Sequence, residues 1–97
     1  MAEYARVVTF DVDADALNAL VNAISSEAGP PEGVPAKRIT VLADRSAGKV
    51  VVDVRFGSED DLRKGAQTLE AMSPPSVGNM RRVSVDAYEV ILDRQAP

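Results

Sequence analysis

The two halves of the chain repeat one short pattern, and this repetition limits the possible folds more than any other feature. In the first half, Asp13 follows a strand-like segment and lies four residues before Leu17. In the second half, Ser58 also follows a strand-like segment and lies four residues before Leu62. Asp and Ser are favoured at the N-cap of a helix. The pattern therefore predicts two strand–helix units related by pseudo-symmetry of the fold.

Four strands and two helices are predicted around these two helix starts. Alternating β-branched and aromatic residues favour strands, whereas leucines spaced three and four apart favour helices. The predicted elements are a strand at Tyr4–Phe10, a helix that starts within Asp11–Asp15 and includes Leu17 to Ile24, strands at Lys37–Ala43 and Lys49–Phe56, a helix from Glu59 to about Met72, and a strand at Arg81–Leu92. The last segment is long for a strand, which indicates a bulge near Asp86 and Ala87 or a tail beyond the sheet. The polar end, Asp93–Pro97, is expected to fray.

The element order is βαββαβ, which is the order of the ferredoxin-like fold. The short Asp44–Gly48 connection joins the second and third strands as a hairpin. Right-handed crossovers in both βαβ units then give one sheet order. We therefore predict one α+β domain over residues 1–97, with a four-stranded antiparallel sheet of order 4-1-3-2 and both helices on one face.

The sheet face that the helices leave open is predicted to be half apolar and half polar. Successive side chains of a strand point to opposite faces. The large apolar residues of the third strand lie at even positions, so Asp53 and Arg55 point to the open face. The residues expected on it are Ala5, Val7, Thr9, Arg38, Thr40, Leu42, Val51, Asp53 and Arg55. The phases of the first and last strands stay open; the first-strand set requires Phe10 in the core.

Composition excludes several classes of function. The chain has no Cys and no His, so disulfides, thiolate nucleophiles and His-based catalysis are absent. The net charge of −4 does not attract nucleic acid or anionic membranes. Val51 and Asp53 occupy strand positions at which RNA-recognition motifs place stacking aromatic residues. We therefore expect no nucleic-acid partner and no membrane partner.

The chain offers no convincing metal site. The three carboxylates of Glu59–Asp61 follow Ser58 and point in directions about 100° apart on a helix, so they are typical of a first helical turn. Asp11, Asp13 and Asp15 lack the Gly and Glu that a calcium loop requires. We expect neither a metal nor a cofactor.

A cytoplasmic location is expected. No apolar run approaches the roughly 20 residues that span a bilayer. The first residues also lack the basic and apolar segments of a signal peptide.

Together with the chain length and the element order, the segment Phe56–Leu62 resembles the antibiotic-biosynthesis-monooxygenase-like domains of the dimeric α/β-barrel superfamily. The resemblance covers nearly the whole chain. It implies a homodimer whose two open sheet faces enclose a cavity, which in active members takes aromatic, often polyketide-like substrates. Haem-degrading members use His, Asn and Trp, but this chain has no His and no Trp. The catalytic residues therefore stay unknown.

We expect a small homodimeric domain that binds a small, partly apolar molecule in an inter-sheet cavity. The candidate ligand contacts are Asp53, Arg55 and Tyr88. Arg55 would donate to a carbonyl or carboxylate; the alternative interpretation is that Asp53 and Arg55 take part in a cross-strand or inter-subunit ion pair. Tyr88 is also typical of a dimer seam.

Two alternatives stay open, and so does the question of whether the protein is an enzyme. One is a cofactor-independent monooxygenase or isomerase that acts on aromatic or polyketide-like substrates. The other is an ACT-like regulatory module, which shares the βαββαβ order and binds amino acids at subunit interfaces. That module prefers a glycine in the first strand–helix turn, and Asp11–Asp15 contains none.

Overall fold

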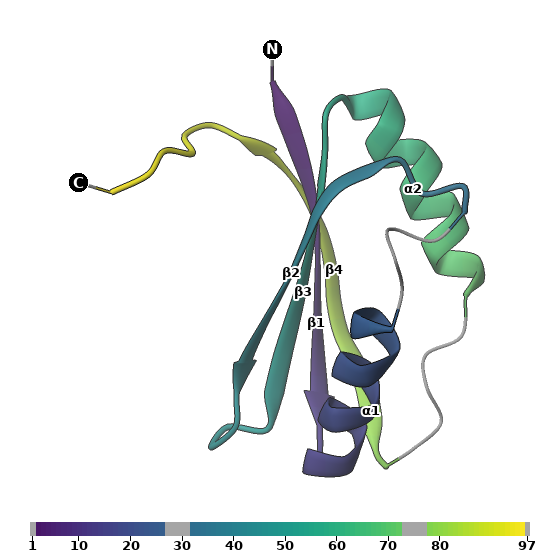
Figure 1. Cartoon of the computed structure of the whole chain (residues 1–97), viewed down its shortest axis with the longest axis vertical. Coiled ribbons are helices and arrows are strands. Elements are labelled where there is room, and N and C mark those ends of the chain that lie inside the picture. Colours follow the sequence, from purple (N-terminus) through teal and green to yellow (C-terminus); the bar gives the residue numbers. More distant parts are fainter. Residues whose placement is uncertain (1, 27–31, 73–77, 97) are drawn as a thin grey trace.

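The computed structural model describes residues 2–26, 32–72 and 78–96, and its element order is the predicted one (Figure 1). The elements are β1 (Glu3–Val12), α1 (Ala14–Ser25), β2 (Ala36–Asp44), β3 (Lys49–Phe56), α2 (Glu59–Ala71) and β4 (Met80–Val90). The fold is ferredoxin-like, as the strand and helix periodicities predicted. Neither of the two helices in the described ranges has the length and apolar character that a membrane crossing requires.

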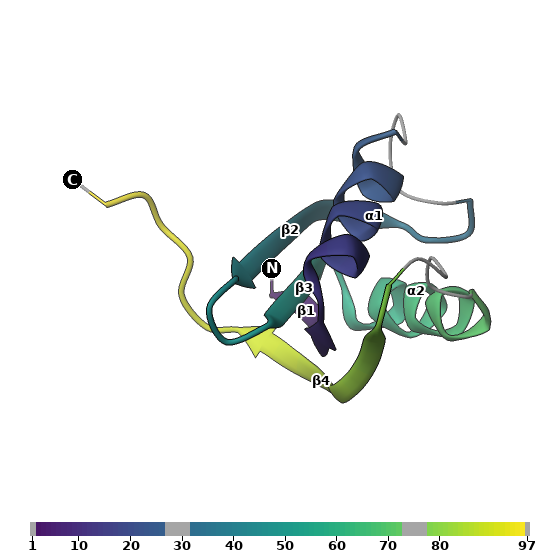
Figure 2. The same ribbon diagram turned by 90° about the horizontal axis from the view of Figure 1, so that it is seen from below.

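The strands form one antiparallel sheet of order β2-β3-β1-β4, which is the predicted 4-1-3-2 order read from the other edge. Both helices lie on the same face of this sheet (Figure 2). On β1, Val8 pairs with Val52, and Phe10 pairs with Val50. Paired side chains share a face, so this register fixes the phase of β1, and Val8 belongs to the core.

The core consists of two apolar clusters, one under each helix. Phe56 and Leu62 anchor the cluster under α2, whereas Leu17 and Val50 anchor the cluster under α1. Val52 packs against both clusters and joins them. The two clusters reproduce the pseudo-symmetry of the sequence in the packing.

Both helices begin at the predicted caps. The Ser58 hydroxyl accepts a hydrogen bond from the Asp61 N–H at 3.1 Å, and the Asp13 carboxylate accepts one from the Ala16 N–H at 2.8 Å. Asp13 also accepts from the backbone N–H and the side-chain amide of Asn79, at 2.8 and 3.1 Å. Asp13 therefore ties the start of α1 to the segment that enters β4.

The carboxylates at the start of α2 form ion pairs within the same helix. Arg63 donates to Glu59 at 2.7 Å and to Asp60 at 3.1 Å, one helical turn away. Within the described ranges, no group of acidic side chains has the arrangement of a metal site.

We expect Asp13 to make the domain sensitive to acid. The N–H groups of Ala16 and Asn79 hold the pKa of its carboxyl below the ordinary value of 3.8. The unfolded chain therefore binds more protons in acid. The stabilisation is fully present above the ordinary value and is lost as the pH falls through the folded-state pKa. Asp13→Ser keeps a capping oxygen that does not titrate.

The melting temperatures of the wild type and of Asp13→Ser, measured between about pH 7 and about pH 3, test this expectation. The wild type should lose more of its melting temperature over this range than the variant. An equal loss in both proteins would show that the Asp13 carboxylate does not carry the acid sensitivity.

The bulge expected near Asp86 and Ala87 is wrong in position, because both residues pair in regular register with β1. The register shift lies where β1 passes from Thr9 to Phe10. The extra residue changes which face the side chains of the first part of β4, residues 80–82, point to. Arg82 therefore lies on the helix-covered face, opposite Phe10. The alternative explanation for the long segment is confirmed, since the chain continues beyond β4 as a tail (Figure 1).

Candidate functional site

The structure places Asp53, Arg55 and Tyr88 on the open face of the sheet. Arg55 pairs with Ala5 of β1 and with Arg38 of β2, and Ala5 in turn pairs with Tyr88. The cross-strand pairs therefore set Arg38, Arg55 and Tyr88 in one row across the sheet. The predicted open-face residues of β1 and β2 all lie on this face, because their register partners on β3 are Val51, Asp53 and Arg55.

Arg55 is the centre of an ion-pair network on this face. Its nearest partner is Asp93 of the tail, at 2.7 Å between Nη1 and Oδ2. Glu3 lies 3.5 Å from the same nitrogen, and Asp53 lies 3.7 Å from Nη2. The hydrogen bond to Asp93 raises the pKa of Arg55 above its ordinary value. The guanidinium therefore stays charged on the sheet.

The Asp53–Arg55 pair is close but incompletely satisfied. The Arg55 side chain is 18% exposed, and the Asp53 side chain is 24% exposed. Within the part of the chain that the structure describes, Asp53 Oδ1 and Arg55 Nε are buried without a hydrogen-bond partner. A buried polar atom without a partner costs about 1–3 kcal/mol. Both atoms have almost no exposed surface, so a further group can pair with them only after neighbouring side chains or the tail move.

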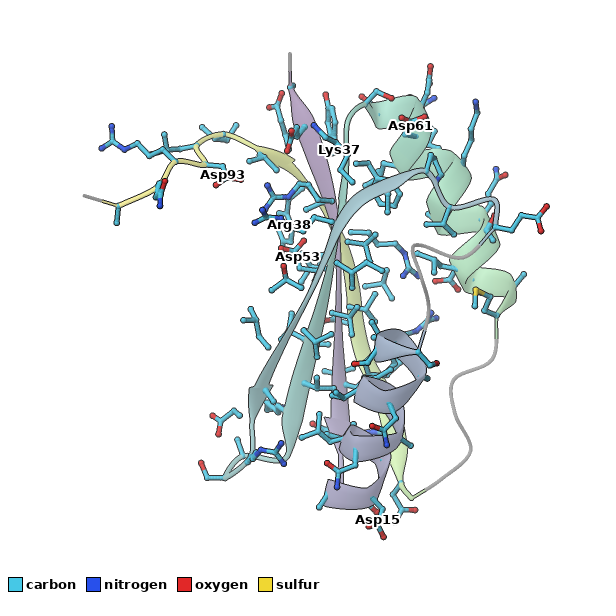
Figure 3. All side chains as sticks on the ribbon, in the orientation of Figure 1. Asp15, Lys37, Arg38, Asp53, Asp61 and Asp93 are labelled. Carbon is cyan, nitrogen blue, oxygen red and sulfur yellow. The ribbon has the colours of Figure 1, made fainter. Side chains whose placement is uncertain are left out.

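Arg38 adds a second positive charge beside Arg55. The two residues are register partners, and the ion pairs found among the described residues do not include Arg38. Figure 3 shows Arg38, Asp53 and Asp93 together on the side of the sheet away from the helices. Adjacent like charges repel, so this part of the face attracts negative groups.

Apolar side chains surround these charges. Leu42 and Tyr88 are both more than half exposed on the open face, while Val7 and Val51 are partly buried there. A small ligand site combines such apolar walls with a few polar groups. The open face provides both kinds of group, but a single sheet cannot enclose a ligand.

A broad depression of about 600 Å³ lies elsewhere, where the β2–β3 hairpin meets the start of β4. Its polar groups already have partners. Asp11 accepts from Arg81 at 2.8 Å and from Lys49 at 3.1 Å, and Asp13 caps α1. The polar atoms without hydrogen-bond partners that were found in the described residues lie on the open face and not in the depression. We therefore take the open face as the candidate site.

Two charged residues were missed by sequence reasoning. Arg6 is 7% exposed on the helix-covered face and donates to Glu70 of α2 at 2.7 Å. Its position in the same alternating set as Val8 was the available signal. Asp93 was assigned to a fraying end, yet it is the nearest partner of Arg55. Nothing local in the sequence pointed to that contact.

Family models, curated protein sequences and solved structures were compared with the chain, and none of them matches it. The resemblance to the dimeric α/β-barrel proteins therefore stays a prediction. The function has to be inferred from the open face itself.

Proposed function

We propose that the chain forms a homodimer through the open faces of two sheets and binds a small, partly apolar molecule in the cavity between them. The observation that carries this proposal is the composition of the open face. Half-buried Asp53 and Arg55 carry unpaired polar atoms there, and exposed Leu42 and Tyr88 surround them. Such a face combines polar groups with exposed apolar area that a second sheet would cover.

A second copy of the chain is the partner that fits this face best. In a two-fold interface each patch meets its own counterpart, so the patch has to complement itself. The open face carries positive Arg38 and Arg55 together with negative Asp53 and Asp86, so two copies can align opposite charges. Two facing sheets pack about 10 Å apart, so the proposed cavity requires that the side chains of the two faces do not fill this layer completely.

Within that cavity each candidate residue has a distinct role. Arg55 donates hydrogen bonds to an anionic or carbonyl oxygen of the ligand. Tyr88 contributes an apolar ring and a hydroxyl at the edge of the cavity. Asp53 helps to orient Arg55 through the ion pair between Oδ2 and Nη2. These roles are those of a binding site.

A cytoplasmic location belongs to the same proposal. The chain has no Cys, so its stability does not depend on an oxidising compartment.

Sedimentation measurements on a charge substitution test the dimer. Val51 lies on the open face of the inner strand β3, so Val51→Lys should bury a positive charge at the interface and convert the dimer to a monomer. The matched control is Val21→Lys, which makes the same substitution on the exposed side of α1. We expect the wild type and the control to sediment at twice the mass of one chain. A monomeric wild type at high micromolar concentration would contradict the proposal.

A further inference from the structure

The tail beyond β4 lies on the open side of the sheet. Residues 91–96 have no helix or strand, and Figures 1 and 2 show this segment leaving the sheet on the side opposite the two helices. The tail therefore shares the side of the molecule on which the proposed ligand would bind.

One side chain holds the tail in this place. In residues 91–96, the hydrogen bonds and ion pairs found among the described residues all belong to Asp93, which contacts Arg55 at 2.7 Å. The neighbouring Ile91 and Leu92 are 82% and 74% exposed, so apolar packing contributes little. Asp93 itself is 57% exposed, and ion pairs with an exposed partner are weak. The contact can therefore be displaced by a competitor.

The charges around Arg55 indicate which competitor would fit. Lys37, Arg38 and Arg55 supply three positive charges, and their carboxylate neighbours are Glu3, Asp53 and Asp93. With the tail in place these six charges cancel; Asp86, which lies on the same face but two strands away from β3, is not counted with them. Without Asp93 the group carries one excess positive charge. A ligand with a single negative charge restores the balance.

The guanidinium geometry points to the same class of ligand. Arg55 binds a carboxylate best through two parallel N–H groups. Asp93 uses Nη1, whereas the neighbouring Nη2 lies 3.7 Å from Asp53, beyond hydrogen-bond distance. Asp93 therefore binds Arg55 through one N–H group. A carboxylate or sulfonate that accepts from two N–H groups would bind Arg55 more strongly.

We propose that Asp93 is an internal stand-in for the ligand, and that the cavity takes a small apolar molecule with one anionic group, which displaces the tail from Arg55. The inference rests on the proposed inter-sheet cavity and adds the class of ligand and a built-in competitor. While the cavity is empty, the tail keeps Arg55 paired. When the ligand binds, its anionic group replaces Asp93, and its apolar part contacts Leu42 and Tyr88.

Two fluorescent dyes that share an aromatic scaffold test the proposal. Anilinonaphthalene sulfonate carries one negative charge, and N-phenylnaphthylamine carries none. Asp93→Asn removes the competitor, so it should tighten sulfonate binding about two- to fivefold, the range set by the strength of such an ion pair. Binding of the neutral dye should not change. The matched control is Glu89→Gln, which removes the same charge from the helix-covered face of β4 and should leave both affinities unchanged.

A second variant isolates the role of Arg55. In Asp93→Asn/Arg55→Gln the gain in sulfonate affinity should disappear, while the neutral dye still binds. If the neutral dye binds but Asp93→Asn does not improve the sulfonate, the stand-in inference is wrong and the cavity survives. If neither dye binds a well-folded wild type, the proposed cavity itself is wrong. Equal gains in sulfonate affinity in the Asp93 and Glu89 variants would show that the effect comes from the net charge of the protein. That result would also overturn the inference.

Discussion

Phe56→Ala is expected to lower the free energy of unfolding by about 3–5 kcal/mol, as truncation of a large buried aromatic residue does. Phe56 is fully buried and packs with Val34, Val54 and Leu62 in the cluster under α2. Alanine would remove the transfer free energy of the ring and leave a cavity that the sheet cannot collapse to fill. Since domains of this size are stable by about 5–15 kcal/mol, much of the stability would be lost.

The pseudo-symmetry of the fold provides the control for this prediction. Phe10 ends the corresponding part of β1 but is only partly buried against the other cluster. Phe10→Ala should therefore cost clearly less than Phe56→Ala in urea denaturation followed by circular dichroism. Equal costs would mean that the two clusters contribute equally and that the burial difference has no energetic weight.

The parts of the fold that were predicted correctly depend on local patterns. Alternation placed Val50 and Phe56 on one face of β3 and Asp53 and Arg55 on the other, and the structure confirms both assignments. The caps at Asp13 and Ser58 act within three residues of chain. Such patterns repeat at the period of a strand or helix, so a single sequence is enough to recognise them.

The parts that could not be predicted depend on contacts between distant residues. Arg6 meets Glu70 across 64 residues, and Arg55 meets Asp93 across 38. No periodic pattern specifies such pairs. The bulge in β4 is also associated with a contact that no periodic pattern specifies. It places Arg82 on the helix-covered face, where Arg82 donates to Glu70 at 2.8 Å. Glu70 also accepts from Arg6. The two arginines, Arg82 more than Arg6, lower the pKa of Glu70.

The candidate site combines both kinds of information. Its backbone framework follows from alternation on β1, β2 and β3, so Asp53 and Arg55 could be placed on the open face in advance. The partner of Arg55 could not be predicted, because Asp93 lies 38 residues further along the chain, beyond the end of β4. The sequence also gave no basis for choosing among the ligands that an arginine accepts. That choice follows from the charges that the fold collects around Arg55.

Gly65→Ala is expected to destabilise the domain by about 1–3 kcal/mol, although alanine is favoured over glycine inside a helix by about 0.8–1 kcal/mol. Gly65 is buried in α2. A Cβ atom there would lie 2.6 Å from Cζ of the Phe56 ring and closer still to Cε1. The ring is fully buried, so moving it away from the helix would disturb the packing around it. Overpacking against a rigid aromatic ring therefore outweighs the gain in helix propensity.

A double variant separates the two effects of this substitution. Phe56→Leu shortens the side chain opposite Gly65 and should relieve the clash, while the propensity gain of alanine remains. In urea denaturation, Gly65→Ala/Phe56→Leu should therefore be more stable than the sum of the two single variants predicts, with a coupling of about 0.5–3 kcal/mol. If Gly65→Ala stabilises the protein on its own, α2 can move away from the sheet at little cost. The close helix–sheet contact would then not be what requires glycine at this position.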